Sequence, residues 1–406
     1  MKLAILGTDS DILHLAAAAR AESYEIIWLG DVRPEDATAI GQFVTDREDR
    51  APQWELLLDR ATVDGVLVGQ GTASAELRAE QLKRLAAEAV SLLTVHPIFN
   101  SVLPYYEIDM ARRETGAIIQ HFNPVAENPA TSQLADWIAH GHPTIGAIHQ
   151  LTCERQIATA ARENVLDALA RDIELLTAIA GDIRRVSAIG PASLESSFAS
   201  LQVQMSSTRL SSLRWSVTAA VSHNAGLQCA LQGEHGIVTL RNLPTPQSDR
   251  QTWQLETLVG DQKVVSTLEA PDPATTAIRK FSEAVLSKQS TRSTWESATR
   301  AMEVVDAVEL SLQKGRTIEV FQQQLTEQLA FRGTMAAFGC GLLLIVFFAV
   351  IVVAVLGGAE GIVKEKIAPA WPLLMLAVLA FFLLLQAIPM LAQKSKRPAD
   401  QSARKE

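Results

Sequence analysis

The sequence predicts an α/β fold of two domains followed by a membrane-spanning hairpin. Short apolar runs alternate with helical patterns over roughly the first 120 residues, strand patterns dominate residues 186–240, and two long uncharged apolar runs lie near the C-terminal end. Alternating strands and helices indicate a parallel sheet with both faces covered, whereas strands grouped after one helix indicate an open, mostly antiparallel sheet.

Residues 1–31 set the expectation for the first domain. A strand over residues 3–6 leads into Gly7 and a Thr-Asp-Ser-Asp turn, followed by a helix over residues 12–19, a strand over residues 26–29 and the acid Asp31. In a dinucleotide-binding βαβ unit of this order, a helix N-terminus lies beneath a pyrophosphate and the acid meets the ribose hydroxyls. We therefore predict a Rossmann dinucleotide-binding domain over residues 1–124.

The turn carries only part of the glycine signature of such a unit. Gly7 holds the first position of G-x-G-x-x-G, but Asp9 and Ile12 stand at the second and third. Two alternatives stay open, because Asp9 and Ser10 can simply cap the helix and Asp31 can lead into the next helix. The predicted cofactor contacts in this unit are Gly7, Thr8, Asp9, Ser10 and Asp31.

Further candidate residues follow the later strands of this domain. A buried strand over residues 66–68 opens into glycines, a strand over residues 90–95 stops at a His-Pro pair, and a strand over residues 117–122 ends at Asn-Pro; helices are predicted over residues 54–58, 75–89 and 104–113. Ligands of parallel sheets bind beyond the carboxyl ends of the strands. The predicted cofactor contacts therefore also include Gly69, Gln70, His96 and Pro97.

The second domain is predicted over residues 125–320. A strand over residues 147–153 precedes an amphipathic helix over residues 163–180, which Gly181 ends. Strand patterns then dominate, and helices return over residues 277–286 and 294–314. We expect an open, mostly antiparallel sheet packed on helices, with a sheet face that offers a surface for a homo-oligomer.

Residues 321–406 predict a linker, a membrane anchor and a basic tail. The runs over residues 335–356 and 372–391 contain no charged residue, and a run of about 20 such residues spans a bilayer as a helix. Arg332 precedes the first run, and Lys394, Lys396 and Arg397 follow the second. By the positive-inside rule, the folded domains and the tail are cytoplasmic and the protein resides in the cell membrane.

Composition narrows the functional classes. A net charge of -9 argues against nucleic acid as a partner. Cys153, Cys229 and Cys340 are far apart in sequence and predict no disulfide framework, which suits a reducing compartment. The N-terminus reads as a strand and not as a signal peptide. His140, His142 and His149 lack a carboxylate at ligand spacing, so no metal site is expected.

Five stretches in this order resemble the glucose–fructose oxidoreductase and inositol dehydrogenase family (Gfo/Idh/MocA), over about residues 1–320. Residues 64–68 (DGVLV) resemble its D-A-V strand and residues 95–97 (VHP) its E-K-P. Residues 141–146 (GHPTIG) are similar to its entry to the second domain, residues 231–238 (LQGEHGIV) to a hairpin, and residues 295–316 to its closing helix. The membrane hairpin lies outside the usual pattern of this family.

The resemblance implies a Rossmann domain joined to an α/β domain, NAD or NADP, and hydride exchange with a sugar or polyol. The family's chemistry rests on the lysine of E-K-P and on an aspartate and a histidine four residues apart on a helix. Those positions carry His96, Asp167 and Arg171 here, so only the aspartate matches.

These three residues form the predicted catalytic set. The unperturbed pKa of a histidine suits proton transfer, so His96 is predicted as the acid/base, with Asp167 and Arg171 holding the substrate. A guanidinium stays protonated and cannot serve as the base. Two alternatives remain, because His96 can be an ordinary turn residue and Asp167 with Arg171 can be a solvent-exposed i, i+4 ion pair.

The sequence thus favours a membrane-anchored NAD(P)-dependent oxidoreductase acting on a sugar-like or polyol substrate. Asp31 favours NAD, because a carboxylate there repels a 2′-phosphate. The alternative is a noncatalytic scaffold or sensor, tethered to the membrane, that binds a nucleotide or sugar. Loss of two glycines, the lysine and the histidine is what that alternative predicts.

Overall fold

The computed structural model describes residues 1–44, 53–59, 61–126, 129–191, 197–219, 226–243, 252–269, 271–287 and 295–320. None of the helices in these ranges combines the length and apolar character that crossing a bilayer requires. The predicted linker, both predicted spans (335–356 and 372–391) and the basic tail lie outside the described residues.

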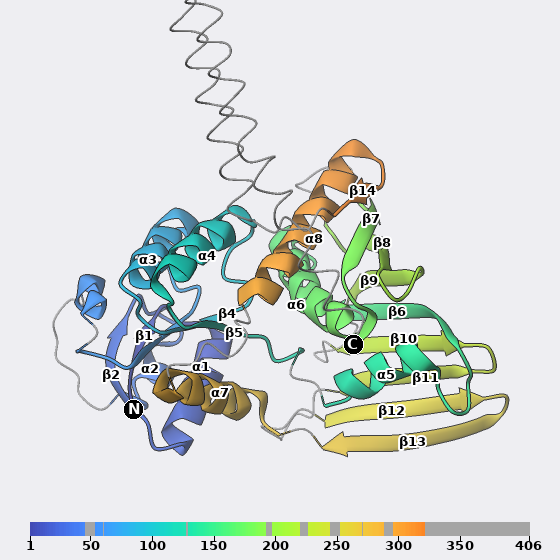
Figure 1. Cartoon of the computed structure of the whole chain (residues 1–406), viewed down its shortest axis with the longest axis horizontal. Helices are drawn as coiled ribbons and strands as arrows, with labels where there is room; N and C mark the ends of the chain where they lie inside the picture. Colours follow the sequence, from blue (N-terminus) through green and yellow to red (C-terminus); the bar gives the residue numbers. More distant parts are fainter. Residues whose placement is uncertain are drawn as a thin grey trace, which may run out of the picture. The chain divides into compact units, whose positions relative to one another are not determined.

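The first sheet contains five parallel strands in the order β2-β1-β3-β4-β5 (Figure 1). Its central strands are mostly apolar, as expected where helices cover both faces, and Leu3, Ile5 and Leu67 are completely buried. Strand order reverses between β1 and β3, which places the ligand crevice of such a sheet at the ends of these two strands. The strands are β1 (Lys2–Leu6), β2 (Glu25–Gly30), β3 (Gly65–Val68), β4 (Leu92–Val95) and β5 (Ile119–Phe122).

The helices of this sheet come from two distant parts of the chain. The N-terminal part supplies α1 (Ser10–Ala21), α2 (Ala37–Ile40), the 3₁₀ helix η1 (Trp54–Leu58), α3 (Ala75–Ala87) and α4 (Leu103–Thr115). Helix α7 (Pro273–Ser287), predicted as part of the second domain, also packs against α1 (Figure 1, gold beside blue). The Tyr24 hydroxyl donates to Ser282 Oγ (2.7 Å). A single boundary at residue 124 therefore does not separate the elements of the two sheets, because α7 lies beyond it in the sequence and packs with the parallel sheet.

The second sheet contains nine strands in the order β13-β12-β11-β10-β6-β9-β8-β7-β14. Among the described strands only the β6–β9 pair is parallel, in agreement with the expected mostly antiparallel sheet. The strands are β6 (Ile148–Ile157), β7 (Ile183–Ile189), β8 (Gln202–Ser207), β9 (Leu213–Ala219), β10 (Leu227–Gly233), β11 (Ile237–Leu243), β12 (Thr252–Val259), β13 (Gln262–Glu269) and β14 (Ile318–Glu319).

Three helices accompany this sheet: α5 (Thr131–His140), α6 (Arg162–Ala180) and α8 (Trp295–Lys314). Helix α5 is absent from the sequence prediction, because its buried residues are only Leu134 and Trp137, too few for a clear period. Helix α6 ends at Gly181, whose φ of 82° is unfavourable for other residues. It contacts both α5 and α8.

Two sets of buried side chains join segments of this domain that are distant in the sequence. Asp172 of α6 is completely buried and accepts hydrogen bonds from Arg155 Nε (2.9 Å) and Trp215 Nε1 (2.9 Å). Cys153 and Cys229 face each other across β6 and β10 as free thiols, with their sulfurs 3.3 Å apart. The two cysteines are 76 positions apart in the sequence, which conceals the contact.

Replacing Asp172 with alanine is expected to lower the free energy of unfolding by about 3–5 kcal/mol, because Arg155 loses the carboxylate that compensates its buried charge. Denaturant unfolding of the full-length protein, followed by tryptophan fluorescence, measures this. The control is Glu319→Ala, which removes an exposed ion pair with Arg185 and should have little effect. Equal losses for the two variants would contradict the role of Asp172.

Candidate functional site

The turn after β1 is held tightly between its two neighbouring strands. Gly7 donates to the Gly30 carbonyl (2.9 Å), and Gly69 donates to the Leu6 carbonyl (3.0 Å). Gly7 has a φ of 83°, and a Cβ there would lie 2.5 Å from Arg78 Nη2 and 2.6 Å from the Gly69 carbonyl oxygen. Only glycine fits at this position.

Asp9 caps α1 and is largely buried. One carboxylate oxygen accepts from Ile12 N (2.9 Å) and the other from Gln70 N (2.9 Å). Burial raises the pKa of this carboxyl, although these two backbone hydrogen bonds oppose the shift. The side chain thus turns inward onto the protein, as the capping alternative supposes, while Ser10 begins the helix as an exposed residue.

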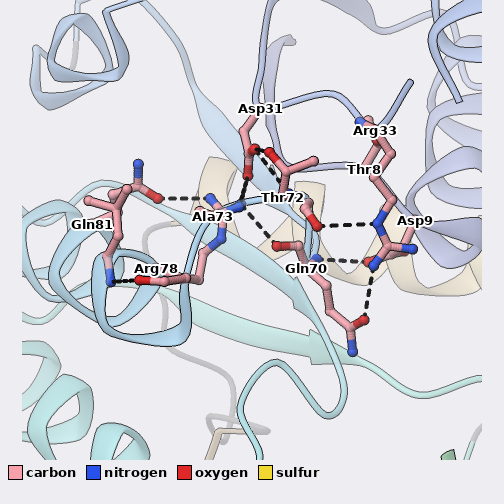
Figure 2. A network of polar contacts seen from close by, with 12 residues as sticks. Thr8, Asp9, Asp31, Arg33, Gln70, Thr72, Ala73, Arg78 and Gln81 are labelled. Carbon is pink, nitrogen blue, oxygen red and sulfur yellow. Dashed lines mark hydrogen bonds and ion pairs between the residues drawn. The ribbon is translucent and has the colours of Figure 1, made fainter. Parts of the chain in front are cut away.

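The end of β2 is linked to the loop after β3 by a polar network (Figure 2). Asp31 forms an ion pair with the buried Arg78 and accepts hydrogen bonds from Thr72. Thr8 Oγ1 accepts from Arg33 N (2.8 Å). The predicted cofactor contacts Thr8, Asp9, Asp31 and Gln70 therefore lie together at the sheet edge, engaged with one another and with neighbouring residues.

The turn after β1 lies at the β1–β3 switch point, which is where dinucleotides bind in sheets of this kind. Within the described ranges, the backbone N–H groups of Ser10 and Asp11 have no hydrogen-bond partner, so the N-terminus of α1 retains donors for a phosphate.

Asp167 lies at the same edge, reached from α6. The side chain of Gln70 donates to the Pro97 carbonyl (3.3 Å) and hydrogen-bonds Asp167. Burial raises the pKa of Asp167 to about 6, although Arg171 and this hydrogen bond oppose the shift. A pocket beside Asp167 is also lined by Asn100, Arg162, Glu163, Leu166, Met302 and Val305.

Arg171 does not pair with Asp167 in the structure. Its Nη2 lies 2.7 Å from Asp11 Oδ2, so the ion pair joins α6 to the first turn of α1. The structure therefore does not contain the solvent-exposed Asp167–Arg171 ion pair that the alternative supposed. Arg171 instead contacts the first turn of α1, next to the predicted cofactor contacts.

His96 is completely buried beside Pro97. Burial lowers its pKa to about 4, against the pull of Glu174, whose Oε2 lies 4.0 Å from His96 Nε2. A histidine with this pKa is neutral at pH 7. In this conformation its ring is also out of contact with solvent, which separates it from a substrate hydroxyl.

A buried cluster around Glu174 was missed by the sequence reasoning. Glu174 pairs with His121 Nε2 (2.6 Å) and accepts from Asn123 Nδ2 (2.6 Å) and Ser297 Oγ (3.0 Å). Burial alone would raise the Glu174 pKa, but the charge and hydrogen bond of His121 and the Asn123 hydrogen bond lower it to about 2. The available signal was an acid within the apolar face of α6, next to Ile173 and Leu175.

Comparison with known proteins identifies the fold. No family model and no curated protein sequence matches the chain. Solved structures do match, among them a putative NADPH-dependent oxidoreductase from Desulfitobacterium hafniense, with a TM-score of 0.66 and 15% identity over 79% of this chain and 97% of that one. The chain has the fold of these oxidoreductases.

Two further structures are similar over nearly their whole length. A 3-ketoreductase from Actinomadura kijaniata, solved with NADP and TDP-benzene, has a TM-score of 0.63 and 18% identity, covering 77% of this chain and 97% of that one. A putative myo-inositol dehydrogenase from Sinorhizobium meliloti has a TM-score of 0.60 and 15% identity, covering 79% and 100%. At these sequence identities the similarity establishes the fold alone, and the activity has to be argued from the residues of the site.

Glu174→Gln tests the buried cluster through pH. The pKa of Glu174 is depressed, so the ionised carboxylate stabilises the fold above its ordinary value of 4.5, and this contribution is lost as pH falls toward 2. The stability difference between wild type and variant should therefore shrink by about 3 kcal/mol between pH 5 and pH 2. Denaturant unfolding across this range measures it; Glu163→Gln, an exposed change on the same helix, is the control. A constant difference would contradict the depressed pKa.

Proposed function

We propose that this protein is an NAD(P)-dependent oxidoreductase that exchanges hydride with a sugar-like or polyol substrate. The observation that carries the proposal is Asp167, a carboxyl with a pKa of about 6 that hydrogen-bonds Gln70 at the crevice of the parallel sheet. Support also comes from the fold, since similar structures were solved with NADP and, for an oxidoreductase from Agrobacterium radiobacter, with NAD+ and L-tartaric acid.

The chain's own residues supply proton transfer and orientation. The nicotinamide ring of the bound cofactor supplies the hydride exchange. Ionised Asp167 accepts the hydroxyl proton as the carbinol carbon is oxidised and returns that proton in the reverse direction. Its pKa leaves it mostly ionised at pH 7 yet close enough to that pH for efficient transfer. The Gln70 amide fixes the carboxylate in position.

A small pocket beside Asp167 combines the polar Asn100 with the apolar Leu166 and Met302, a mixture that suits the hydroxyl groups and C–H faces of a sugar or polyol. Arg162, which also lines the pocket, is held by an ion pair with Glu309. We assign the base to Asp167 and not to the buried His96, and Arg171 keeps α6 close to α1 through Asp11.

The membrane anchor is part of the proposal. Its support is the two uncharged runs at residues 335–356 and 372–391 and the basic residues that flank them. The oxidoreductase domains and the tail are then cytoplasmic. The face of the nine-stranded sheet is the proposed surface for a homo-oligomer.

A noncatalytic module that binds a nucleotide or sugar is the second candidate. The observation that favours it is the self-contained network at the sheet edge, in which Asp9, Asp31 and Gln70 already have partners. This candidate predicts that the wild-type protein shows no turnover.

Asp167→Asn is expected to lower kcat/KM for alcohol oxidation by on the order of 10²–10⁴, since an amide cannot accept the proton. Cofactor affinity should stay within about twofold, a change of only a few tenths of a kcal/mol. Wild-type kcat/KM should rise with pH through about 6 and then level off. Absorbance of the reduced cofactor, in a screen of sugars and polyols with the full-length protein, measures turnover.

The matched control is Asp136→Asn, an exposed change on α5. Loss of turnover in His96→Gln with normal turnover in Asp167→Asn would return the acid/base role to His96. Absence of turnover with every substrate, together with intact nucleotide binding, would favour the noncatalytic module.

Ending the chain at Phe331 is expected to move the protein from the membrane fraction to the soluble fraction, because both proposed spans are removed. Fractionation of cells expressing each form, with detection by immunoblot, measures this. Full-length protein in the soluble fraction would overturn the anchor, and aggregation of the shortened chain would count against the boundary.

A further inference from the structure

The carboxylate of Asp31 has no acceptor position left for a ribose. An ionised carboxylate offers about four lone-pair positions, and Asp31 receives four donors (Figure 2). Oδ1 accepts from the Thr72 backbone N–H (3.0 Å) and hydroxyl, and Oδ2 accepts from Ala73 N (3.3 Å) and Arg78 Nη2. Burial alone would raise the Asp31 pKa, but Thr72 and Arg78 hold it below its usual value.

Arg78 keeps Asp31 in this arrangement. Its side chain is only 2% exposed and donates from Nη1 to Gln81 Oε1 (2.9 Å) and from Nη2 to the Gln70 carbonyl (3.2 Å). Freeing Asp31 for a ligand would leave a buried guanidinium without its counter-ion, which is costly. The two charges therefore stay together and cancel.

Arg33 lies on the same loop as Asp31, together with the acids Glu35 and Asp36. Its backbone N–H is fixed by Thr8 Oγ1, while its guanidinium donates to two neutral oxygens, the Gly71 carbonyl (3.2 Å) and Gln70 Oε1 (3.2 Å). Within the described part of the chain Arg33 forms no ion pair. Both bonds are long and neutral, and a phosphate would offer shorter, charge-assisted ones.

We infer that Arg33, and not Asp31, recognises the adenosine ribose of the cofactor, and that its ligand is the 2′-phosphate of NADP(H). The ribose of a dinucleotide lies at the end of the second strand of this fold, where an arginine accommodates a 2′-phosphate and a free acid binds the 2′-hydroxyl. Asp31 and Arg78 compensate one another, so Arg33 is the cation of this loop, which also carries the acids Glu35 and Asp36. The inference rests on the proposed function and removes the reason, given by Asp31 in the sequence, for favouring NAD.

The test is cofactor binding to the full-length protein, by fluorescence of NADPH and NADH and by competition with adenosine 2′,5′-bisphosphate or adenosine 5′-monophosphate. These two competitors differ only in the 2′-phosphate. Wild type should prefer NADPH and the bisphosphate by about tenfold or more, the value of a charged hydrogen bond. Arg33→Gln should lose this preference while NADH affinity changes by less than about twofold.

The matched control is Arg20→Gln, which removes an exposed arginine of α1 and should retain the preference. Melting temperatures establish that both variants are folded, and Arg33→Lys should keep part of the preference because its charge remains. Preference of wild type for NADH, or equal weakening of NADPH and NADH in Arg33→Gln, would overturn the inference and leave the proposed function standing. No binding of either cofactor at millimolar concentration would instead remove the proposed function.

Discussion

The burial of ionised Glu174 is the constraint on which the rest of the site depends. A carboxylate without solvent requires several partners, and Glu174 finds them in His121 and Asn123 at the end of β5 and in Ser297 of α8. These contacts bring α6 to the carboxyl ends of the parallel strands. Two residues earlier on the same helix, Asp172 fixes α6 to the nine-stranded sheet through Arg155 and Trp215.

Because α6 is held from both sides, its polar residues are positioned for chemistry. Asp167 meets Gln70 and Arg171 meets Asp11, so one helix supplies the proposed base and a contact to the phosphate end of the crevice. Most of the hydride chemistry in such enzymes belongs to the cofactor. In the proposed reaction the protein orients the substrate and moves one proton, and Asp167 is suited to the latter through its raised pKa.

At the edge of the parallel sheet, the acids predicted to contact the cofactor are engaged within the protein. Acids lie at the glycine turn and at the end of β2, yet Asp9 caps a helix and Asp31 compensates Arg78. Arg33 rests on neutral acceptors, which a phosphate can replace. The same network that favours a noncatalytic module therefore also identifies Arg33 as the side chain whose hydrogen bonds a ligand phosphate would strengthen. Turnover separates the enzyme from the noncatalytic module, because both candidates bind a nucleotide.

The sequence by itself determined the local elements and the architecture. Uninterrupted apolar runs such as residues 66–68 indicate buried parallel strands, and the long period of α6 is unmistakable. It also brought forward Asp31 and His96, because positions at strand ends follow from local patterns, and the family resemblance added Asp167. Burial, pairing and charge state did not follow, since they depend on residues distant in the chain. Only the tertiary structure decided that His96 is buried and neutral, that α7 covers the first sheet, that Arg171 pairs with Asp11 and that Arg78 occupies Asp31, because each of these contacts joins segments that the sequence keeps far apart.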